Sequence, residues 1–198
     1  SLMSFCDGTS CAHMPIVQDH KRAFEGDTGP NTGGMGTYSF ANHSLPFLSK
    51  QDVLDAQQTN ERVALELYKQ TGQHFRGVLY GGFMLTKKGV KVIEYNARFG
   101  DPEAMNVLSI LETDFIEICN AIVSESLASL KISFKNEATV CKYAVPVGYP
   151  DSPSKNFEVF CNPEDHNLYL AAVQKTAGGL IATGSRTAAF VGINQKIG

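Results

Sequence analysis

Residues 77–103 read GVLYGGFMLTKKGVKVIEYNARFGDPE and decide the fold of the chain. Two apolar runs, 77–85 and 90–95, flank the polar residues 86–89, which end in glycine, and this arrangement predicts an antiparallel β-hairpin. The segment 101–103, Asp-Pro-Glu, then predicts the start of a helix, because acidic side chains are favourable at a helix N-terminus. The stretch therefore predicts a strand, a turn, a second strand and a helix.

The second strand of this hairpin carries a pair of oxygen ligands. Glu94 and Asn96 lie two residues apart, so strand alternation places both side chains on one face. A carboxylate and an amide oxygen suit a hard cation such as Mg²⁺, which often shares its ligands with substrate phosphates. Arg98 continues the same face if the strand persists, and its guanidinium would balance phosphate charge. The spacing also fits a surface strand with an arginine ion pair, so the residues alone leave both interpretations open.

A glycine-rich segment, GDTGPNTGGMGTY, occupies residues 26–38 and holds five glycines in the eleven residues 26–36. Glycine permits positive φ and lets other atoms approach the main chain closely. No Gly-Lys-Ser/Thr sequence follows, so the segment lacks the P-loop pattern, and it lacks the dinucleotide-binding pattern as well. We expect an ordered loop that contacts a ligand; a plain cluster of turns is the alternative.

Two helices are predicted from periodicity and capping. Residues 51–71 have helical spacing, and Gly72 stands where a C-terminal cap belongs. Asp114 and Glu117 predict the start of a further helix that runs to about residue 127. The apolar residues of the first helix that can share a face are Val53, Leu54, Val63, Ala64, Leu67 and Tyr68.

Short strands are predicted at the two ends of the chain. We expect a strand at 2–6 and another at 14–17. After about residue 130 the sequence consists of short β-rich segments separated by turns, with a hairpin at Gly178-Gly179. The predicted fold class is therefore α+β. We expect two units, an α+β unit over 1–132 and a smaller β-rich unit over 133–198.

Composition excludes several classes of protein. The chain has 198 residues and a net charge of −3, which gives no electrostatic case for binding nucleic acid. No apolar run approaches the ~18 residues that a membrane span requires. The sequence contains no Cys-x-x-Cys pair, so a zinc site is not expected. We expect the cysteines to be free thiols in a reducing compartment. The five cysteines are Cys6, Cys11, Cys119, Cys141 and Cys161.

Three segments, taken together, resemble one enzyme family. QDHKR at 18–22, GPNTGGMG at 29–36 and EYNARFGDPE at 94–103 are similar to signature segments of glycinamide ribonucleotide synthetase, the phosphoribosylamine–glycine ligase of purine synthesis. The resemblance implies the C-terminal subdomain of an ATP-grasp fold, an antiparallel sheet with helices, followed by a small β-rich domain. It also implies a cytoplasmic enzyme that is a monomer or a weak dimer.

The chemistry that the resemblance implies is ATP-dependent amide formation. ATP activates the carboxylate of glycine as glycyl phosphate, and 5-phosphoribosylamine attacks it to give glycinamide ribonucleotide, ADP and phosphate. Glu94 and Asn96 match the family's ligands for Mg²⁺ or Mn²⁺. The segment that would lie over the substrates near the transferred phosphate is Asn31, Thr32, Gly33, Gly34, Met35 and Gly36.

Five further residues are candidates within the same motifs. We expect Lys21, Arg22 and Arg98 to contact phosphate or acyl-phosphate oxygens. Asp19 and Asp101 are candidates for orienting the amine nucleophile. Neither acid needs to be a strong base, because ATP-driven ligation rests mostly on positioning and charge neutralisation.

The sequence departs from the family pattern in two ways. It starts in what resembles the middle of an ATP-grasp strand, so we expect a C-terminal portion of the enzyme that does not ligate alone. Near the other end, residues 170–173 read LAAV where the family has a His-Ala-Gly-Thr-like run, and residues 184–186 read GSR where it has Gly-Gly-Arg.

Other functions stay open. The alternatives are a non-catalytic module that binds metal or nucleotide, a structural remnant, and another ATP-grasp carboxylate–amine ligase. The intact set of Glu94, Asn96, Arg98 and Asp101 favours the ligase, because a remnant has no physical need to keep these residues together.

Overall fold

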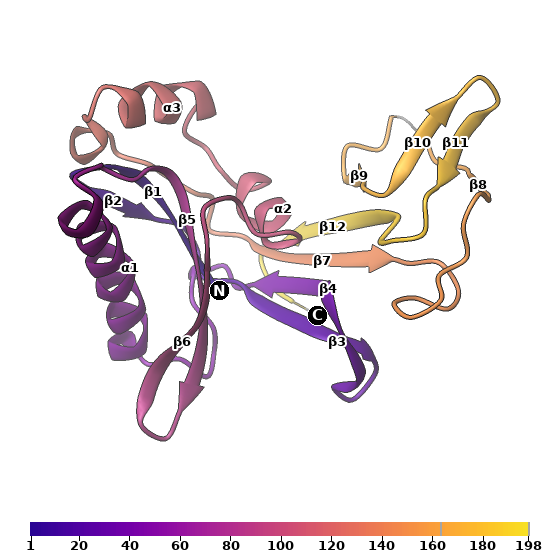
Figure 1. Cartoon of the computed structure of the whole chain (residues 1–198), viewed down its shortest axis with the longest axis horizontal. Coiled ribbons are helices and arrows are strands. Elements are labelled where there is room, and N and C mark those ends of the chain that lie inside the picture. The colour runs from indigo at the N-terminus through magenta and orange to yellow at the C-terminus, as the bar shows by residue number, and fades with distance from the viewer. Residues whose placement is uncertain (163, 198) are drawn as a thin grey trace.

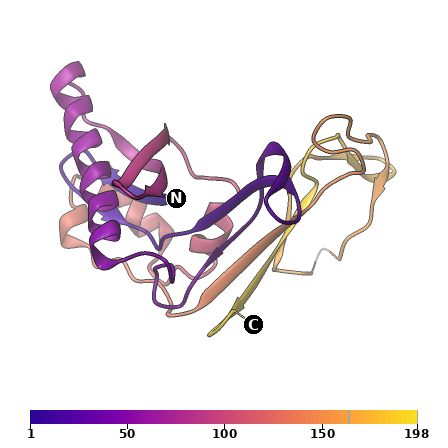
Figure 2. The ribbon, with the colours of Figure 1, turned by 90° about the horizontal axis from the view of Figure 1, so that it is seen from below.

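The computed structural model describes residues 1–162 and 164–197. Within these residues the strands form three sheets, all of them paired antiparallel. In Figure 1 the helices gather around one sheet, and a second sheet leads away from them toward a small β-rich end. Figure 2 shows the same elongated outline from below. The predicted mixture of antiparallel sheets with few helices is confirmed.

The first sheet contains the predicted hairpin and the predicted N-terminal strand. Its strands are, in sheet order, β2 (Cys11–His13), β1 (Leu2–Asp7), β5 (Arg76–Thr86) and β6 (Gly89–Asn96). The turn of the hairpin places Thr86 opposite Gly89. A register shift follows the pair formed by Gly82 and Glu94, so β6 is irregular next to the candidate metal ligand.

Residues 14–17 form no strand, contrary to the prediction. Pro15 has no N–H and cannot donate to a ladder. The N–H of Ile16 bonds to the carbonyl of His43 at 3.2 Å, outside any sheet. The segment is buried throughout and connects the first sheet to the second.

Two helices cover the two faces of the first sheet. α1 (Lys50–Thr71) packs on one face and α3 (Phe115–Val123) on the other. Side chains of β1 alternate between them: Leu2 packs in the cluster beneath α1, whereas Met3 and Phe5 pack beneath α3. This central strand therefore contributes to both halves of the core.

The ends of α1 are set by local capping. The Ser49 hydroxyl accepts the N–H of Asp52, and the Asp52 carboxylate accepts the N–H of Ser49 at 2.8 Å. Gly72 ends the helix with φ 71°, which glycine adopts at little cost. The predicted helix and its glycine cap are confirmed.

The predicted apolar face of α1 is only partly buried. Leu54 and Tyr68 remain 47% and 41% exposed, and the buried residues of the helix are Ala56 and Asn60. Asn60 donates to the carbonyl of Leu2 at 3.2 Å. The helix therefore docks through one small and one polar buried side chain, with Val53 packing beside them, and periodicity of apolar residues does not reveal the polar contact.

The second predicted helix is shorter than expected. Asp114 caps α3 as predicted, by accepting two backbone N–H groups, but the helix ends at Val123. Glu125 adopts φ 57° and so breaks the helix before the 3₁₀ turn η1 (Leu127–Ser129).

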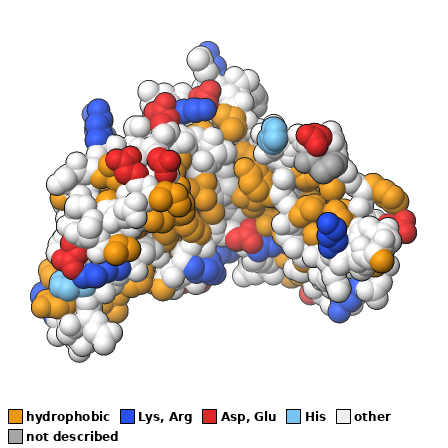
Figure 3. All heavy atoms as spheres, turned by 90° about the horizontal axis from the view of Figure 1, so that it is seen from above, with side chains coloured by type: hydrophobic (Ala, Val, Ile, Leu, Met, Phe, Trp, Pro, Cys, Tyr) orange, Lys and Arg blue, Asp and Glu red, His pale blue; other side chains and the backbone are white. Residues whose placement is uncertain are grey.

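Figure 3 looks onto the α3 side, where hydrophobic side chains lie between charged ones. Within the described residues, no helix has both the length and the apolar character needed to cross a bilayer.

The glycine-rich segment belongs to the second sheet. In sheet order the strands are β3 (Gln18–Phe24), β4 (Thr28–Ser39), β7 (Ala138–Ala144), β12 (Ala188–Asn194) and β9 (Leu168–Leu170). The predicted loop is therefore mostly strand. Its ladder to β3 is interrupted between the pairs Arg22–Asn31 and His20–Gly36, so residues 32–35 form a bulge.

Glycine is required here by close packing as well as by conformation. A Cβ on Gly36 would lie 2.8 Å from the carbonyl oxygen of Cys141 on β7. Gly34, inside the bulge, adopts φ 117°, and a Cβ there would lie 2.7 Å from Pro102. The glycines therefore let β4 approach its neighbours, whereas the sequence had predicted an ordered loop, with a cluster of turns as the alternative.

The third sheet lies at the β-rich end of the molecule. It is composed of β10 (Val173–Thr176), β11 (Gly179–Ala182) and β8 (Glu158–Val159). The predicted hairpin at Gly178-Gly179 is confirmed, with Thr176 opposite Gly179. The second sheet takes strands from both sides of the predicted boundary at 132/133, and the division into two units stays a prediction.

A buried polar chain joins the short helix α2 (Glu103–Leu108) to the second sheet. Asn106, which has no exposed surface, accepts the Thr37 hydroxyl and donates to the Thr139 hydroxyl at 2.9 Å. Thr139 in turn shares a hydrogen bond of 2.7 Å with Ser39. Every member would leave an unpaired buried group if its neighbour were removed.

We predict that Asn106→Ala lowers the free energy of unfolding by about 2–4 kcal/mol, because it removes the acceptor of the buried Thr37 hydroxyl and one of the two hydrogen bonds of the Thr139 hydroxyl. Urea denaturation followed by circular dichroism measures the change. Asn120→Ala, at an exposed position on α3, is the matched control and should stay within about 0.5 kcal/mol of the parent. Equal effects of the two substitutions would contradict the buried chain.

Candidate functional site

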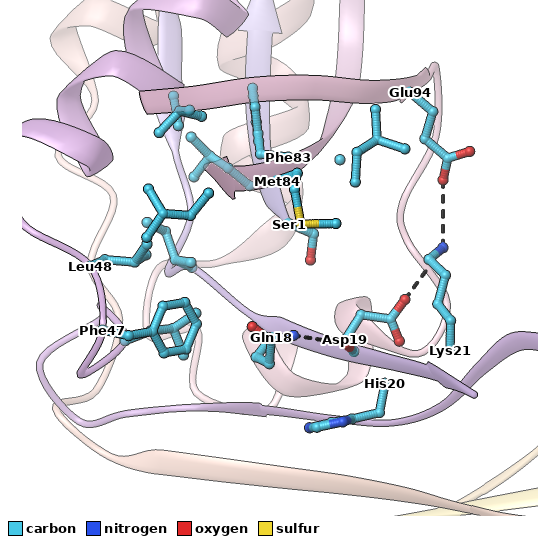
Figure 4. Close-up of a pocket in the computed structure, with 18 of the residues that line it drawn as sticks. Ser1, Gln18, Asp19, His20, Lys21, Phe47, Leu48, Phe83, Met84 and Glu94 are labelled. Carbon is cyan, nitrogen blue, oxygen red and sulfur yellow. Dashed lines mark hydrogen bonds and ion pairs between the residues drawn. The ribbon is translucent and has the colours of Figure 1, made fainter. Parts of the chain in front are cut away.

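A cavity of about 750 Å³ lies between the β5–β6 hairpin, the segment before α1, and β3. Figure 4 shows its apolar side chains on one side and its charged ones on the other. The apolar side chains include Leu45, Phe47, Leu48, Phe83, Met84, Leu85, Val90 and Ile93. Phe47, Met84 and Ile93 are at least half exposed, so this wall is open to a ligand.

The charged side of the cavity is a row of three groups. The Lys21 ammonium lies 3.3 Å from Asp19 Oδ2 and 3.6 Å from Glu94 Oε1. These groups come from two sheets, because Lys21 and Asp19 belong to β3 and Glu94 to β6. Burial lowers the pKa of Lys21, but the two carboxylates outweigh it and the pKa is raised. Lys21 is therefore a fixed positive charge between two acids.

Asp19 has an oxygen that is buried and free. Its side chain is only 9% exposed, and Oδ1 has no hydrogen-bond partner within the described residues. Burial, with a further contribution from the nearby Glu103, raises the pKa of Asp19. A buried carboxylate oxygen without a donor is costly, and such an atom marks a place where a ligand can donate.

Asn96 and Arg98 lie beside Glu94 along the chain. β6 ends at Asn96, so the strand does not persist to Arg98, which was the condition for placing Arg98 on the same face. Arg98 nevertheless stays close, with Nη2 3.4 Å from Asn96 Oδ1, while Nη1 donates to the carbonyl of Phe99 at 2.7 Å. Its guanidinium is exposed next to the candidate metal ligands.

The oxygens of Glu94 and Asn96 fit a hard cation. The Glu94 carboxylate and the Asn96 amide oxygen lie two residues apart and can both act as metal ligands. Their contacts with Lys21 and Arg98 are long, at 3.6 Å and 3.4 Å. Residues 1–162 and 164–197 contain no cluster of three or more His, Cys, Asp or Glu side chains that could hold a metal. The donor set therefore suits Mg²⁺ or Mn²⁺, which complete their shells with water and phosphate oxygens.

The bulge on β4 is held by an arginine from the other end of the chain. Arg186 Nη1 donates to the carbonyls of Gly33 at 3.0 Å and Gly34 at 3.1 Å. The same nitrogen donates to the carbonyl of Asp101 at 3.1 Å. The Arg186 side chain is only 16% exposed, so these contacts form where water competes little.

Asp101 is bound on both carboxylate oxygens. Arg186 Nη2 lies 3.1 Å from Oδ2, and the Tyr143 hydroxyl donates to Oδ1 at 2.6 Å. The Arg186 guanidinium also lies over the Tyr143 ring, 4.6 Å from its centre. Burial, together with the Asp101 carboxylate, raises the pKa of Tyr143, so the hydroxyl keeps its proton.

The remaining candidates are divided between the cavity and the interior. Arg22 and Asn31 line the cavity, although Arg22 donates to the carbonyl of Gly29 at 2.7 Å. Thr32 donates to the carbonyl of Lys21 at 2.8 Å, which ties the bulge to β3. The residues of the predicted substrate segment that are buried are Gly34, Met35 and Gly36.

Sequence reasoning missed two residues of this arrangement. Arg186 lies in the GSR run, which departs from the family's Gly-Gly-Arg and was assigned no role, and Tyr143 belongs to no motif. The retained arginine was the one available signal, because a guanidinium is always charged and carries five donors that can bind several acceptors at once.

The chain is similar to known ligases along its whole length. The family described as "Phosphoribosylglycinamide synthetase, ATP-grasp (A) domain" matches residues 1–104. The phosphoribosylamine–glycine ligase of Methanosarcina acetivorans is 51% identical over 198 residues, which is 100% of the chain and 45% of that relative. The chain thus spans less than half the length of this curated relative.

Solved structures agree with the sequence match. The crystal structure of the phosphoribosylamine–glycine ligase of Thermotoga maritima has a TM-score of 0.78 at 29% identity, over 98% of this chain and 48% of that one. A biotin carboxylase domain of a single-chain bacterial carboxylase shares the fold, with a TM-score of 0.61 at 15% identity over 98% of this chain and 42% of that one. The family indicated by the three motifs is confirmed: the chain belongs to the phosphoribosylglycinamide synthetase ATP-grasp (A) domain family.

Proposed function

We propose that the chain provides part of the active site of an ATP-dependent ligase that joins glycine to 5-phosphoribosylamine in purine biosynthesis. The products are glycinamide ribonucleotide, ADP and phosphate, and glycyl phosphate is the intermediate. The observation that carries the proposal is the charged row Asp19–Lys21–Glu94 on the wall of a cavity whose other wall is apolar. A nucleotide has the same division between its base and its phosphates.

The apolar wall suits the base of ATP. Phe47, Met84 and Ile93 present exposed apolar surface to the cavity, and burial of such surface under a planar ring is favourable. Lys21 then lies on the side where the phosphates of the same molecule would lie, and its ammonium would neutralise their charge.

We propose that Glu94 and Asn96 hold Mg²⁺ or Mn²⁺ against these phosphates. The ion would supply neutralisation of phosphate charge. Arg98 lies next to both ligands and would add a second positive charge on the same side. The Lys21 ammonium lies 3.6 Å from the Glu94 carboxylate, so this carboxylate would attract both the ammonium and the metal ion.

The two acids proposed to orient the amine differ in their surroundings. Both carboxylate oxygens of Asp101 are bound, by Tyr143 and Arg186, whereas Asp19 Oδ1 is unpartnered among the described residues. We therefore assign the amine-orienting role to Asp19: its carboxylate lines the cavity and would accept a hydrogen bond from the amine of 5-phosphoribosylamine as the nitrogen attacks the acyl carbon. Asp101 is then a positioning residue that holds Arg186.

The bulge on β4 is proposed to border the phosphoryl-transfer position. Its residues 32–35 lie next to Asp19, since a Cβ on Gly34 would be 3.0 Å from Asp19 Oδ1. Backbone N–H groups at a bulge can bind anionic oxygens, which suits an acyl phosphate.

We further propose that the enzyme is cytoplasmic and is a monomer or a weak dimer. In this enzyme, residues 133–198 would form a small β-rich unit.

A chimera tests the proposed function. In the Methanosarcina acetivorans ligase, the segment that aligns with all 198 residues of this chain is replaced by this chain. We expect the purified, folded chimera to release ADP only when glycine and 5-phosphoribosylamine are both present. A folded chimera that binds ATP and Mg²⁺ without ligating would support a non-catalytic binding module instead.

We predict that Glu94→Gln weakens Mn²⁺ binding in the presence of ATP at least about ten-fold, because it removes the charged ligand. The measurement is the electron paramagnetic resonance signal of free Mn²⁺ during titration of the chimera. Glu112→Gln, at an exposed position away from the cavity, is the matched control and should leave the affinity unchanged. Unchanged binding in Glu94→Gln would contradict the metal assignment.

Asp19→Asn should lower ligation at least about 100-fold but raise thermal stability at neutral pH. The pKa of Asp19 is raised in the folded chain, so ionisation of this group destabilises the native state. Stability is lost as pH rises from the ordinary carboxyl pKa to the raised one, and the gain from asparagine is therefore present at pH 7. That gain should vanish below pH ~4, where the carboxyl is protonated in both states. Calorimetric scans across pH measure it; a lower Tm for the variant at pH 7 would contradict the assignment.

Arg186→Lys should reduce kcat about 10- to 100-fold in the chimera with little change in the KM for ATP. An ammonium cannot bond at once to two glycine carbonyls, to the carbonyl of Asp101 and to its carboxylate, so the bulge would move relative to Asp19. Arg62→Lys, exposed on α1, is the control. A variant with parental kcat would show that the contacts of Arg186 are not needed for turnover.

A further inference from the structure

The β1–β2 hairpin carries two cysteines at directly opposed positions. Cys6 on β1 pairs with Cys11 on β2, and their Sγ atoms lie 3.2 Å apart. Both belong to the described residues, among which no other two cysteine sulfurs are in contact. This pair lies on the α1 side of the sheet and takes no part in the cavity described above.

The ladder places the pair in the class of opposed residues that come closest together. Hydrogen bonds join Met14 N to Met3 O at 2.9 Å and Asp7 N to Ser10 O at 3.2 Å. Cys6 and Cys11 are therefore a non-hydrogen-bonded pair, for which Cα atoms are typically about 4.5 Å apart. That separation lies within the range for disulfides, whose Cα atoms are roughly 4.4–6.8 Å apart. The sulfurs need to approach by only about 1 Å to reach bonding distance.

The hairpin is held rigidly around the two thiols. Asp7 Oδ1 accepts the N–H groups of Thr9 at 2.9 Å and Ser10 at 2.7 Å, which fixes the turn. Asp7 Oδ2 accepts the N–H of Leu127 at 3.0 Å, which fixes the turn to the rest of the core. The two sulfurs are thus held together before any bond forms, so closure of the ring orders little additional chain.

The two thiols differ in access and in acidity. Cys6 has no exposed surface, whereas Cys11 is partly exposed on the edge strand of the sheet. The hydrogen bond from the Cys6 thiol lowers the pKa of Cys11, and the same hydrogen bond together with burial raises the pKa of Cys6. An incoming reagent therefore meets Cys11 first, and Cys11 is the better thiolate.

We propose that Cys6 and Cys11 form a thiol–disulfide site that reacts with small-molecule disulfides and closes reversibly into an intrachain bond. The Cys11 thiolate attacks one sulfur of the disulfide, which breaks the S–S bond, releases one thiolate and leaves a mixed disulfide on Cys11. The Cys6 sulfur then attacks Cys11 Sγ, expels the second thiolate and forms the Cys6–Cys11 bond. The two cysteine protons pass to the two released thiolates, so the chain is oxidised by two electrons and the reagent is reduced by two.

The bond would tie the edge strand β2 to the central strand β1. An edge strand is the part of a sheet that opens most easily, and β2 has only three residues. A cross-link there restricts the unfolded chain over a short ring, and we expect a rise in Tm of roughly 4–8 °C in the oxidised form. The proposal does not depend on ligase activity.

The test is incubation of the 198-residue chain with excess oxidised glutathione, followed by alkylation of free thiols and mass spectrometry of peptides under non-reducing conditions. We expect a Cys6–Cys11 cross-link with the loss of two hydrogen atoms, a higher Tm, and reversal of both by dithiothreitol. Cys119→Ser is the matched control for a partly exposed lone cysteine and should leave the cross-link and the rise in Tm intact. Cys11→Ala should abolish both.

Other outcomes overturn the proposal. Recovery of Cys6 in the alkylated, reduced state while Cys11 carries glutathione would show that the second step does not occur. A cross-link between Cys11 and any other cysteine would show that the opposed pair is not the reacting one. If Cys11→Ala does not fold, Cys6→Ala provides the same measurement, because it should stop the reaction at the mixed disulfide on Cys11.

Discussion

The Arg186 guanidinium joins three segments that are far apart along the chain. It donates to two carbonyls of the β4 bulge, at Gly33 and Gly34, and also binds the turn at Asp101 before α2. Burial of the side chain strengthens these charge-assisted hydrogen bonds, and the ring of Tyr143 covers one face of the guanidinium. The position of the bulge relative to the cavity depends on this contact, because the ladder between β3 and β4 is broken at that point.

The site takes its charged residues from two different sheets. Asp19 and Lys21 lie on β3 of the second sheet, whereas Glu94 lies on β6 of the first. The buried hydrogen bonds of Asn106 hold α2 against the second sheet, and α2 follows closely on the end of β6. Polar contacts thus add to the apolar cluster that joins Leu2 of the first sheet to Tyr38 of the second, and the cavity lies in the space between the two sheets.

Local chemistry in the sequence predicted much of the fold. The β5–β6 hairpin, α1 with its cap at Gly72, and the Asp114 cap all depend on neighbouring residues, and all were found. The errors came from long-range contacts. Glycines that suggested a loop are explained by the close approach of β7 to Gly36, and the apolar run at 14–17 is a buried connection that forms no strand of its own. The cavity motifs were recognisable, but the partner of Asp101 was not, because Arg186 is 85 residues away.

The Asp19 carboxylate is buried in the site and leaves one oxygen without a hydrogen-bond partner among the described residues. A buried carboxylate with a free oxygen costs stability, and a raised pKa shows that burial and the nearby Glu103 outweigh the Lys21 ammonium at Asp19. Asp101 differs in burial as well as in pairing: its side chain is 52% exposed and both oxygens are bound, so it needs nothing from a ligand. The difference therefore separates the acid that holds the scaffold from the acid that is left available to a substrate.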